Sequence, residues 1–290
     1  MKTAHALPIP DWMTPNAWVD WAFYNVDCLD ADEVHELVRI GRLHQEAPGT
    51  IVQVWPRRAA GRPRIQVAFA RERHRRLDPA IDTVVLAGVG SSILGTAALA
   101  KDVADRLDRP VAGIVTGFGA AGALIDALTG WYWYGAINRL DEVLRAALGA
   151  AAGAARLDAS VVALEIDAAG PAAPDAVLRD LLLDPAIHRA IAHSKGGLQL
   201  GPATCAVAPQ VAARAAPLRV GTLGAVVDLP ACVRGCQILG QFDWLGLVNS
   251  SHAAPHVLAG RSHSLNPAMP FGISLRDDVW GRYGADSAYA

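Results

Sequence analysis

The sequence is poor in cysteine, and its charges nearly balance. Its four cysteines form no C-x-x-C pair and are not spaced like a disulfide framework; they are Cys28, Cys205, Cys232 and Cys236. The last two would share one face if that stretch were helical, but a metal site would need further ligands nearby. The formal net charge of −2 gives no general attraction to nucleic acid or to an anionic membrane. We therefore expect reduced thiols, no metal, no cofactor and no nucleic-acid partner.

The sequence also lacks a segment that would carry the protein to or through a membrane. Residues 1–10 do not show the basic stretch followed by an apolar stretch that marks a signal peptide. The longest alanine-rich run, from Arg145 to Arg156, is too short to span a bilayer. We expect a cytoplasmic protein without stable membrane insertion.

What the chain does have is enough apolar residues for a large core. Its 290 residues are 52% hydrophobic, which suits one α/β domain over residues 1–290. Within it, residues 1–80 are expected to form an N-terminal helix and hairpin region. Residues 118–185 have a looser pattern and are expected to form a lid or cap, in which the aromatic cluster 131–134 could line an apolar pocket. A strand is also predicted at residues 160–166.

In the N-terminal region, a helix is predicted from Asp30 to Leu43. Asp30 can cap its first turn, and Glu33 completes a capping box. Two strand-like runs with β-branched and aromatic residues follow at 49–55 and 64–70. The residues between the two runs suit a turn, so the pair is predicted to form a hairpin.

A strand–helix–strand unit comes next. Residues 83–87 are a continuous apolar run, typical of a parallel strand buried on both faces. A glycine-rich loop leads from this run into a helix predicted over 93–107, and a second buried strand follows at 111–116. This order is that of a βαβ unit, and it predicts an α/β fold with a mainly parallel sheet flanked by helices.

The glycine-rich stretch 88–95 is compatible with several chemistries. A dinucleotide fingerprint would need glycine where Ile93 stands, and a P-loop would need lysine where Thr96 stands. Residues 90–92, Gly-Ser-Ser, also resemble the hydroxyl-rich loop of sugar isomerase domains, so binding of a phosphosugar or nucleotide stays open. An oxyanion loop and a tight turn without a ligand are the other interpretations.

Residues 192–196, Ala-His-Ser-Lys-Gly, have the pattern of a nucleophile elbow, in which a serine stands on a sharp turn between a strand and a helix. The turn strains the serine backbone, so the positions two before and two after it, Ala192 and Gly196, must be small. A weak strand over 186–191 precedes the pattern, and a helix is predicted over 197–213, although Pro202 interrupts it.

Two further segments provide an acid and a base. A clear strand is predicted at 218–227, and a short helix running into a strand at 232–240. Asp243 stands just after this apolar run, and His263 lies in a loop towards the C-terminus. Asp228 is a rival acid because it ends the preceding strand; the rival bases are His252 and His256.

Ser194, Asp243 and His263 follow one another in the order found in α/β-hydrolases, and a triad needs these three residue types together. At this point the chain resembles the α/β-hydrolase superfamily. Residues 192–196 look like its G-H-S-x-G elbow with alanine for the first glycine, and 222–225, Thr-Leu-Gly-Ala, look like the T-F-G-x strand end of lipase-like members.

The resemblance implies a serine hydrolase of the esterase, lipase or thioesterase kind that acts through an acyl-enzyme on a small-molecule or lipid-like acyl ester. It also implies an oxyanion hole built from backbone N–H groups of Gly88, Val89, Gly90 and Lys195. A non-catalytic binding protein with this fold is a further alternative. If the resemblance holds, the strands at 83–87, 111–116, 187–192 and 218–227 are neighbours, and the loop 88–92 faces Ser194.

Overall fold

The fold is described from a computed structural model, which covers residues 15–44, 48–58, 65–68, 77–117, 174–251 and 255–283. Of the expected lid, residues 118–173 lie outside the described residues, and with them the aromatic cluster 131–134 and the strand predicted at 160–166. The rest of that segment contains helix α7, which packs against α8 and α9 beside the sheet.

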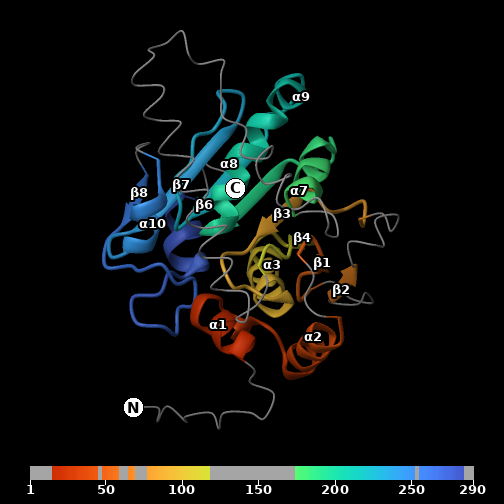
Figure 1. The fold of residues 1–290 in the computed structure, drawn as a ribbon, viewed down its shortest axis with the longest axis vertical. Coiled ribbons are helices and arrows are strands. Elements are labelled where there is room, and N and C mark those ends of the chain that lie inside the picture. The colour runs from red at the N-terminus through yellow and green to blue at the C-terminus, as the bar shows by residue number, and fades with distance from the viewer. Residues whose placement is uncertain are drawn as a thin grey trace.

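An eight-stranded, mostly parallel sheet organises the described residues (Figure 1). Its strand order is β2-β1-β4-β3-β5-β6-β7-β8, and β1 runs antiparallel to both of its neighbours while the strands from β4 to β8 are parallel. The bounds are β1 Ile51–Val54, β2 Ile65–Ala68, β3 Thr83–Leu86, β4 Val111–Ile114, β5 Arg189–His193, β6 Arg219–Leu223, β7 Arg234–Gly240 and β8 His256–Leu258.

The four strands predicted as neighbours are adjacent at the centre of this sheet, in the order β4-β3-β5-β6. The prediction of an α/β fold with a mainly parallel sheet is therefore confirmed. The predicted hairpin is also present, because β1 and β2 pair from Ile51 with Ala68 to Val54 with Ile65.

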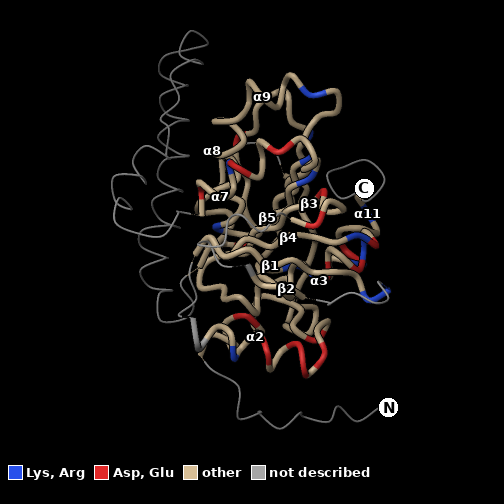
Figure 2. Tube along the Cα trace, turned by 90° about the vertical axis from the view of Figure 1, so that its right-hand side faces the viewer, with Lys and Arg blue, Asp and Glu red and all other residues tan. Residues whose placement is uncertain are grey.

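Helices cover both faces of the sheet (Figure 2). Their bounds are α1 Pro15–Phe23, η1 Val26–Cys28, α2 Ala31–His44, α3 Ile93–Leu107, α7 Pro174–Leu183, α8 Lys195–Ala206, α9 Ala208–Ala212, α10 Trp244–Asn249, η5 Leu275–Trp280 and α11 Gly281–Tyr283.

Side chains of β3 alternate between the layers: Val85 packs in the core under α1 to α3, whereas Val84 and Leu86 pack in the core under α7 to α9. This alternation explains why β3 is buried at every position. No helix among the described residues is both long and apolar enough to cross a bilayer.

Two predicted helices differ from the structure. The segment 232–240 forms strand β7 from Arg234 and has no helix at its start, so Cys232 and Cys236 do not share a helix face. Pairing with both β6 and β8 explains this, because a segment that forms hydrogen bonds to a neighbouring strand on each side must be extended. The helix predicted over 197–213 is divided into α8, which continues through Pro202, and the short α9.

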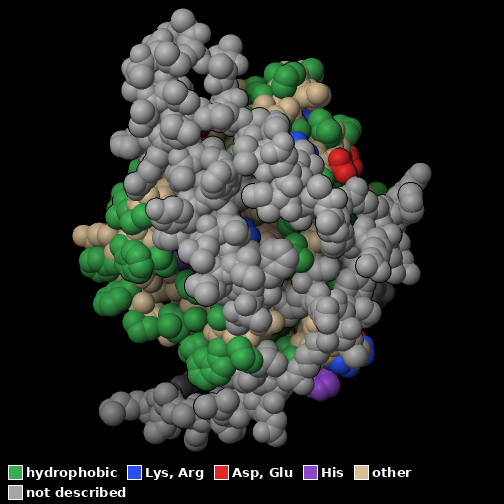
Figure 3. Space-filling model, viewed as in Figure 1, with side chains coloured by type: hydrophobic (Ala, Val, Ile, Leu, Met, Phe, Trp, Pro, Cys, Tyr) green, Lys and Arg blue, Asp and Glu red, His purple; other side chains and the backbone are tan. Residues whose placement is uncertain are grey.

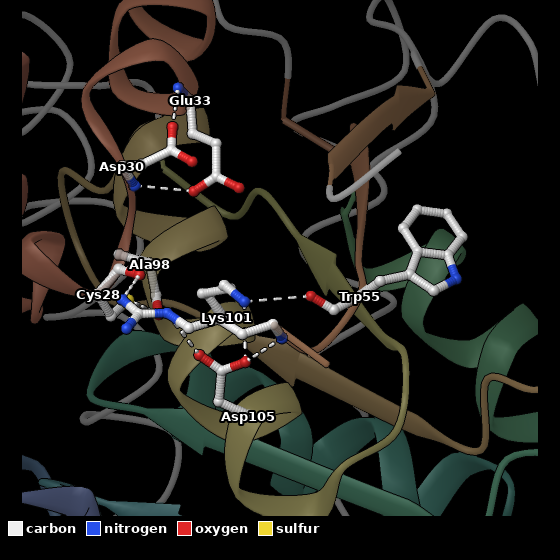
Figure 4. A network of polar contacts seen from close by, with 8 residues as sticks. Cys28, Asp30, Glu33, Trp55, Ala98, Lys101 and Asp105 are labelled. Atoms are coloured by element: carbon white, nitrogen blue, oxygen red, sulfur yellow. Dashed lines mark hydrogen bonds and ion pairs between the residues drawn. The ribbon is translucent and has the colours of Figure 1, made fainter. Parts of the chain in front are cut away.

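The predicted capping box at the start of α2 is present (Figure 4). The N–H of Glu33 donates to Asp30 Oδ1 at 2.9 Å, and the N–H of Asp30 donates to Glu33 Oε2 at 2.8 Å. Two of the N–H groups left without partners at a helix start are thereby satisfied.

A polar network around a buried lysine of α3 reaches the residue that follows β1 (Figure 4). The Lys101 side chain is fully buried; its Nζ donates to Asp105 Oδ1 at 2.8 Å and to the Trp55 carbonyl at 3.3 Å. Asp105 also accepts from the N–H of Arg57, whose guanidinium reaches the Cys28 carbonyl. This network fixes the N-terminal elements against α3.

Candidate active site

Ser194 stands on a strained turn between β5 and α8. Its φ of 53° and ψ of −123° lie in a region that non-glycine residues rarely adopt, as the elbow pattern predicted. The Ser194 N–H donates to the Leu223 carbonyl at 2.8 Å. A Cβ on Gly196 would lie 2.6 Å from the Ala87 carbonyl oxygen, so the turn needs a residue without a side chain there.

The structure brings Ser194, His263 and Asp243 into one hydrogen-bonded row. His263 Nε2 lies 2.8 Å from Ser194 Oγ, and His263 Nδ1 lies 2.7 Å from Asp243 Oδ1. The relative exposures of Ser194, His263 and Asp243 are 6%, 8% and 0%, so all three side chains are largely removed from water. A carboxylate only accepts hydrogen bonds, so it favours the tautomer in which Nδ1 carries the proton and Nε2 accepts from the serine.

Asp243 is held by the start of α10, which it caps. Its Oδ1 accepts from the N–H of Gly246 at 2.7 Å, in addition to the contact with His263. A Cβ on Gly246 would come within 2.7 Å of Asp243 Oδ2, and within the described part of the chain that oxygen has no hydrogen-bond donor. The acid that contacts the histidine is thus Asp243, and not the rival Asp228.

His263 lies against Gly224, at the end of β6. Gly224 has a φ of +68°, and a Cβ on it would lie 2.8 Å from the His263 ring, so both the backbone and the space require glycine. Of the rival bases, His256 belongs to β8 and packs at a tilt against Tyr283, and His252 lies outside the described residues.

The glycine-rich loop after β3 faces the serine, as predicted. A Cβ on Gly88 would lie 2.9 Å from Ser194 Cβ, which shows how closely the two backbones approach. The loop turns tightly, since the N–H of Ser91 donates to the Gly88 carbonyl at 3.3 Å and Gly90 has a φ of +68°. The Gly88 N–H donates to Tyr24 Oη at 2.5 Å. Of the N–H groups expected to stabilise the oxyanion, that of Gly88 therefore already has an acceptor within the protein.

Tyr24 and His193 are two residues of the site that sequence reasoning missed. Tyr24 Oη lies 3.1 Å from His193 Nδ1, and His193 Nε2 lies 2.9 Å from the His263 carbonyl oxygen. Burial raises the pKa of the Tyr24 phenol, so the phenol keeps its proton. His193 directly precedes Ser194, so its position in the sequence could have indicated a place in the site. Nothing in the sequence links Tyr24 to the elbow.

Burial holds the pKa of His193 well below its ordinary value, and the charge of the nearby His263 lowers it further. The folded protein therefore binds fewer protons at this ring than the unfolded chain does below pH ~6.5. The free energy of unfolding therefore has its full value, as far as this ring is concerned, above that pH. It decreases as the pH falls from there towards the pKa of the folded state.

We expect His193→Gln to flatten this pH dependence. The ring accounts for a loss of up to ~1.4 kcal/mol of unfolding free energy for each pH unit below 6.5. Urea unfolding at pH 7, 6 and 5 measures the slope for wild type and variant. His188→Gln, which alters an exposed histidine on the same segment, is the matched control. Equal slopes for wild type and His193→Gln would contradict the expectation.

No protein-family model, curated protein or solved structure matches this chain. Function must therefore be argued from the geometry of the site itself.

Proposed function

We propose that the protein is a serine hydrolase of the α/β-hydrolase kind that cleaves a carboxylic ester or thioester through an acyl-enzyme. The observation that carries the proposal is the row of contacts from Asp243 through His263 to a serine with strained backbone. The contact of Ser194 with His263 has the length that proton transfer from nucleophile to base requires, and that of His263 with Asp243 has the length of the hydrogen bond that orients the base. The order of the three residues and their places after strands of a parallel sheet add support.

In this mechanism Ser194 Oγ attacks the carbonyl carbon while its proton passes to His263 Nε2. Asp243 keeps the histidine in the required tautomer and stabilises the imidazolium that forms. The intermediate then expels the alcohol or thiol, which takes the proton from His263. Water, deprotonated in turn by His263, cleaves the acyl-enzyme and releases the carboxylic acid.

We assign stabilisation of the oxyanion to backbone N–H groups on either side of the serine. Lys195 begins α8, where the first N–H groups point out of the helix and the helix dipole favours negative charge. The second donor comes from the loop after β3. Because Gly88 donates to Tyr24, we assign this role to Val89, next to it.

The alternative of phosphate binding at residues 88–95 is disfavoured by Asp20. The N–H of Ser92, at the start of α3, donates to Asp20 Oδ1 at 3.0 Å, and the Ser92 hydroxyl donates to Asp20 Oδ2. A carboxylate thus already fills the place where a phosphate would meet the helix N-terminus. The Ser91 hydroxyl is engaged too, since it donates to the Gly88 carbonyl.

The surroundings of the acid suit an apolar acyl group. Phe242 and Trp244, on either side of Asp243, are both exposed, and Phe242 packs edge-on against Phe271 with ring centroids 5.6 Å apart. Figure 3 shows hydrophobic side chains gathered over α10 and β8. We propose an acyl ester with an apolar acyl chain as the substrate class, and a panel of esters of increasing chain length would define it.

A fluorophosphonate probe tests the proposal. Such probes phosphonylate a serine that a neighbouring base activates, so we expect one adduct per chain, and peptide mass spectrometry should locate it on Ser194. Heat-unfolded protein is the control, because unfolding separates the serine from His263. Failure of the folded protein to react would favour a non-catalytic binding protein. Thermal stabilisation by sugar phosphates would instead favour the glycine-rich loop as the functional site.

A further inference from the structure

The C-terminal end of helix α1 contacts the loop that carries His263. Three successive carbonyls of α1 accept hydrogen bonds from this loop: Trp21 from Asn266 Nδ2 at 2.5 Å, Ala22 from Ser264 Oγ at 2.7 Å and Phe23 from the N–H of Leu265 at 2.8 Å. The last carbonyls of a helix have no partner inside the helix, so these bonds satisfy groups that burial would otherwise leave unpaired. The ring of Phe23 also lies edge-on to His263, at 6.0 Å.

The same segment holds the glycine-rich loop on its other side. Asp20 accepts the N–H and the hydroxyl of Ser92, and Tyr24 accepts the N–H of Gly88. Asp20 is fully buried, and Tyr24 is 2% exposed. Residues 20–24 therefore contact both loops that flank the serine: the loop assigned to the oxyanion and the loop with the base.

The hydrogen bonds through His193 have only one consistent direction. The His263 carbonyl can only accept, so His193 Nε2 must carry a proton and donate to it. In a neutral ring Nδ1 is then bare and accepts from the hydroxyl of Tyr24. The oxygen of Tyr24 in turn accepts from the N–H of Gly88. A directed chain thus runs from Gly88 through Tyr24 and His193 to the backbone of His263.

We propose that Tyr24 and His193 are positioning residues, which fix the oxyanion loop and the catalytic histidine relative to each other through this directed chain. The inference rests on the proposed hydrolase function. No hydrogen bond of the described residues joins either side chain to Ser194 Oγ, and both act through groups that do chemistry. Their effect is therefore expected on turnover and not on the binding of the ester, because displacement of reacting groups by a fraction of an ångström lowers the rate.

The test begins with Tyr24→Phe, which removes one hydroxyl and keeps the ring. The Gly88 N–H then loses its acceptor, and His193 Nδ1 loses its donor. We expect kcat for an acyl ester to fall about 10- to 100-fold, with KM changed by no more than about 2-fold. Tyr283→Phe is the matched control, since the Tyr283 ring packs against His256 in β8, and it should keep wild-type turnover.

A second variant, His193→Gln, tests whether Tyr24 and His193 act through one connected series of hydrogen bonds or have independent effects on the structure. Glutamine can still donate towards the His263 carbonyl but offers Tyr24 no acceptor in the position of Nδ1. If the two residues act through one chain, the double variant should be no slower than the slower single variant, whereas independent effects would multiply.

Nitrogen NMR of His193 gives a readout that does not depend on turnover. In the wild type we expect the tautomer protonated at Nε2, and in Tyr24→Phe a shift of the Nδ1 resonance as its hydrogen bond is lost. An active wild type whose Tyr24→Phe variant has unchanged kcat, or a His193 protonated at Nδ1, would overturn the positioning role alone. A wild type that neither hydrolyses esters nor reacts with the fluorophosphonate would overturn the proposed function, and the positioning role with it.

Discussion

Replacement of Ser194 by alanine is expected to abolish ester hydrolysis while the protein stays folded. The substitution deletes one hydroxyl, and with it the atom that His263 Nε2 contacts at 2.8 Å. For a serine that acts as nucleophile within a triad, the loss in kcat is on the order of 10⁶-fold. Initial rates with an acyl ester measure the loss, and the melting temperature shows whether the fold is kept.

The matched control is Ser262→Ala, which removes a half-buried hydroxyl one residue before His263. It should retain wild-type turnover, because the Ser262 side chain is not in the row of contacts between acid, base and nucleophile. If Ser194→Ala kept full activity, the hydrolase proposal would fail, and the glycine-rich loop would become the leading candidate site.

Asp243→Asn is expected to have the next largest effect, a fall in kcat on the order of 10⁴-fold. Asp243 Oδ1 accepts from both His263 Nδ1 and the Gly246 N–H. If the new amide group turns its NH₂ to the histidine, the ring must present a bare Nδ1, and its protonated Nε2 cannot accept from Ser194. If the amide oxygen stays there, the negative charge that stabilises the imidazolium is lost, and a buried NH₂ takes the place of Oδ2.

Asp228→Asn makes the same chemical change at the rival acid and should cost less than about 10-fold, because Asp243 already occupies the histidine nitrogen. Steady-state kinetics of the two variants side by side decide the assignment. A larger loss in Asp228→Asn than in Asp243→Asn would transfer the role of the acid to Asp228.

The parts of the site that follow strands could be predicted from the sequence. Continuous apolar runs predicted β3, β4 and β6, and parallel strands place their carboxyl ends at one edge of the sheet. The loop after β3 and the serine after β5 were therefore expected to meet there. Small residues two positions before and after Ser194 predicted its strained backbone, because larger side chains there would collide with the turn.

The sequence could not decide between the two acids. Asp228 and Asp243 both follow apolar runs, so each could end a strand at the edge of the sheet. The choice depends on the start of α10. Asp243 caps this helix, and the carboxylate oxygen that does so, Oδ1, also contacts His263 Nδ1. The full length of strand β7 could not be predicted either, since a short apolar segment fits a helix as well as a strand until its neighbours in the sheet are known.

The contacts of residues 20–24 could not be predicted at all. Tyr24 and Asp20 meet their partners in the glycine-rich loop 64 and 72 positions further along the chain. An aspartate near the end of a short helix and a tyrosine just after it look like ordinary surface residues in a sequence, and both become buried only when this segment packs on the rest of the fold.

The contacts between α1 and the loop after His263 join residues that are 242 and 245 positions apart. During synthesis on the ribosome, the elbow and both of its neighbouring strands therefore emerge well before the histidine and the residues that dock on α1. A nascent chain at that stage holds the proposed nucleophile without its base. The proposed enzyme would thus have no complete triad until His263 has been translated and its loop has docked on α1, because closing this loop, which joins residues 242 positions apart, is also the step that assembles the catalytic machinery.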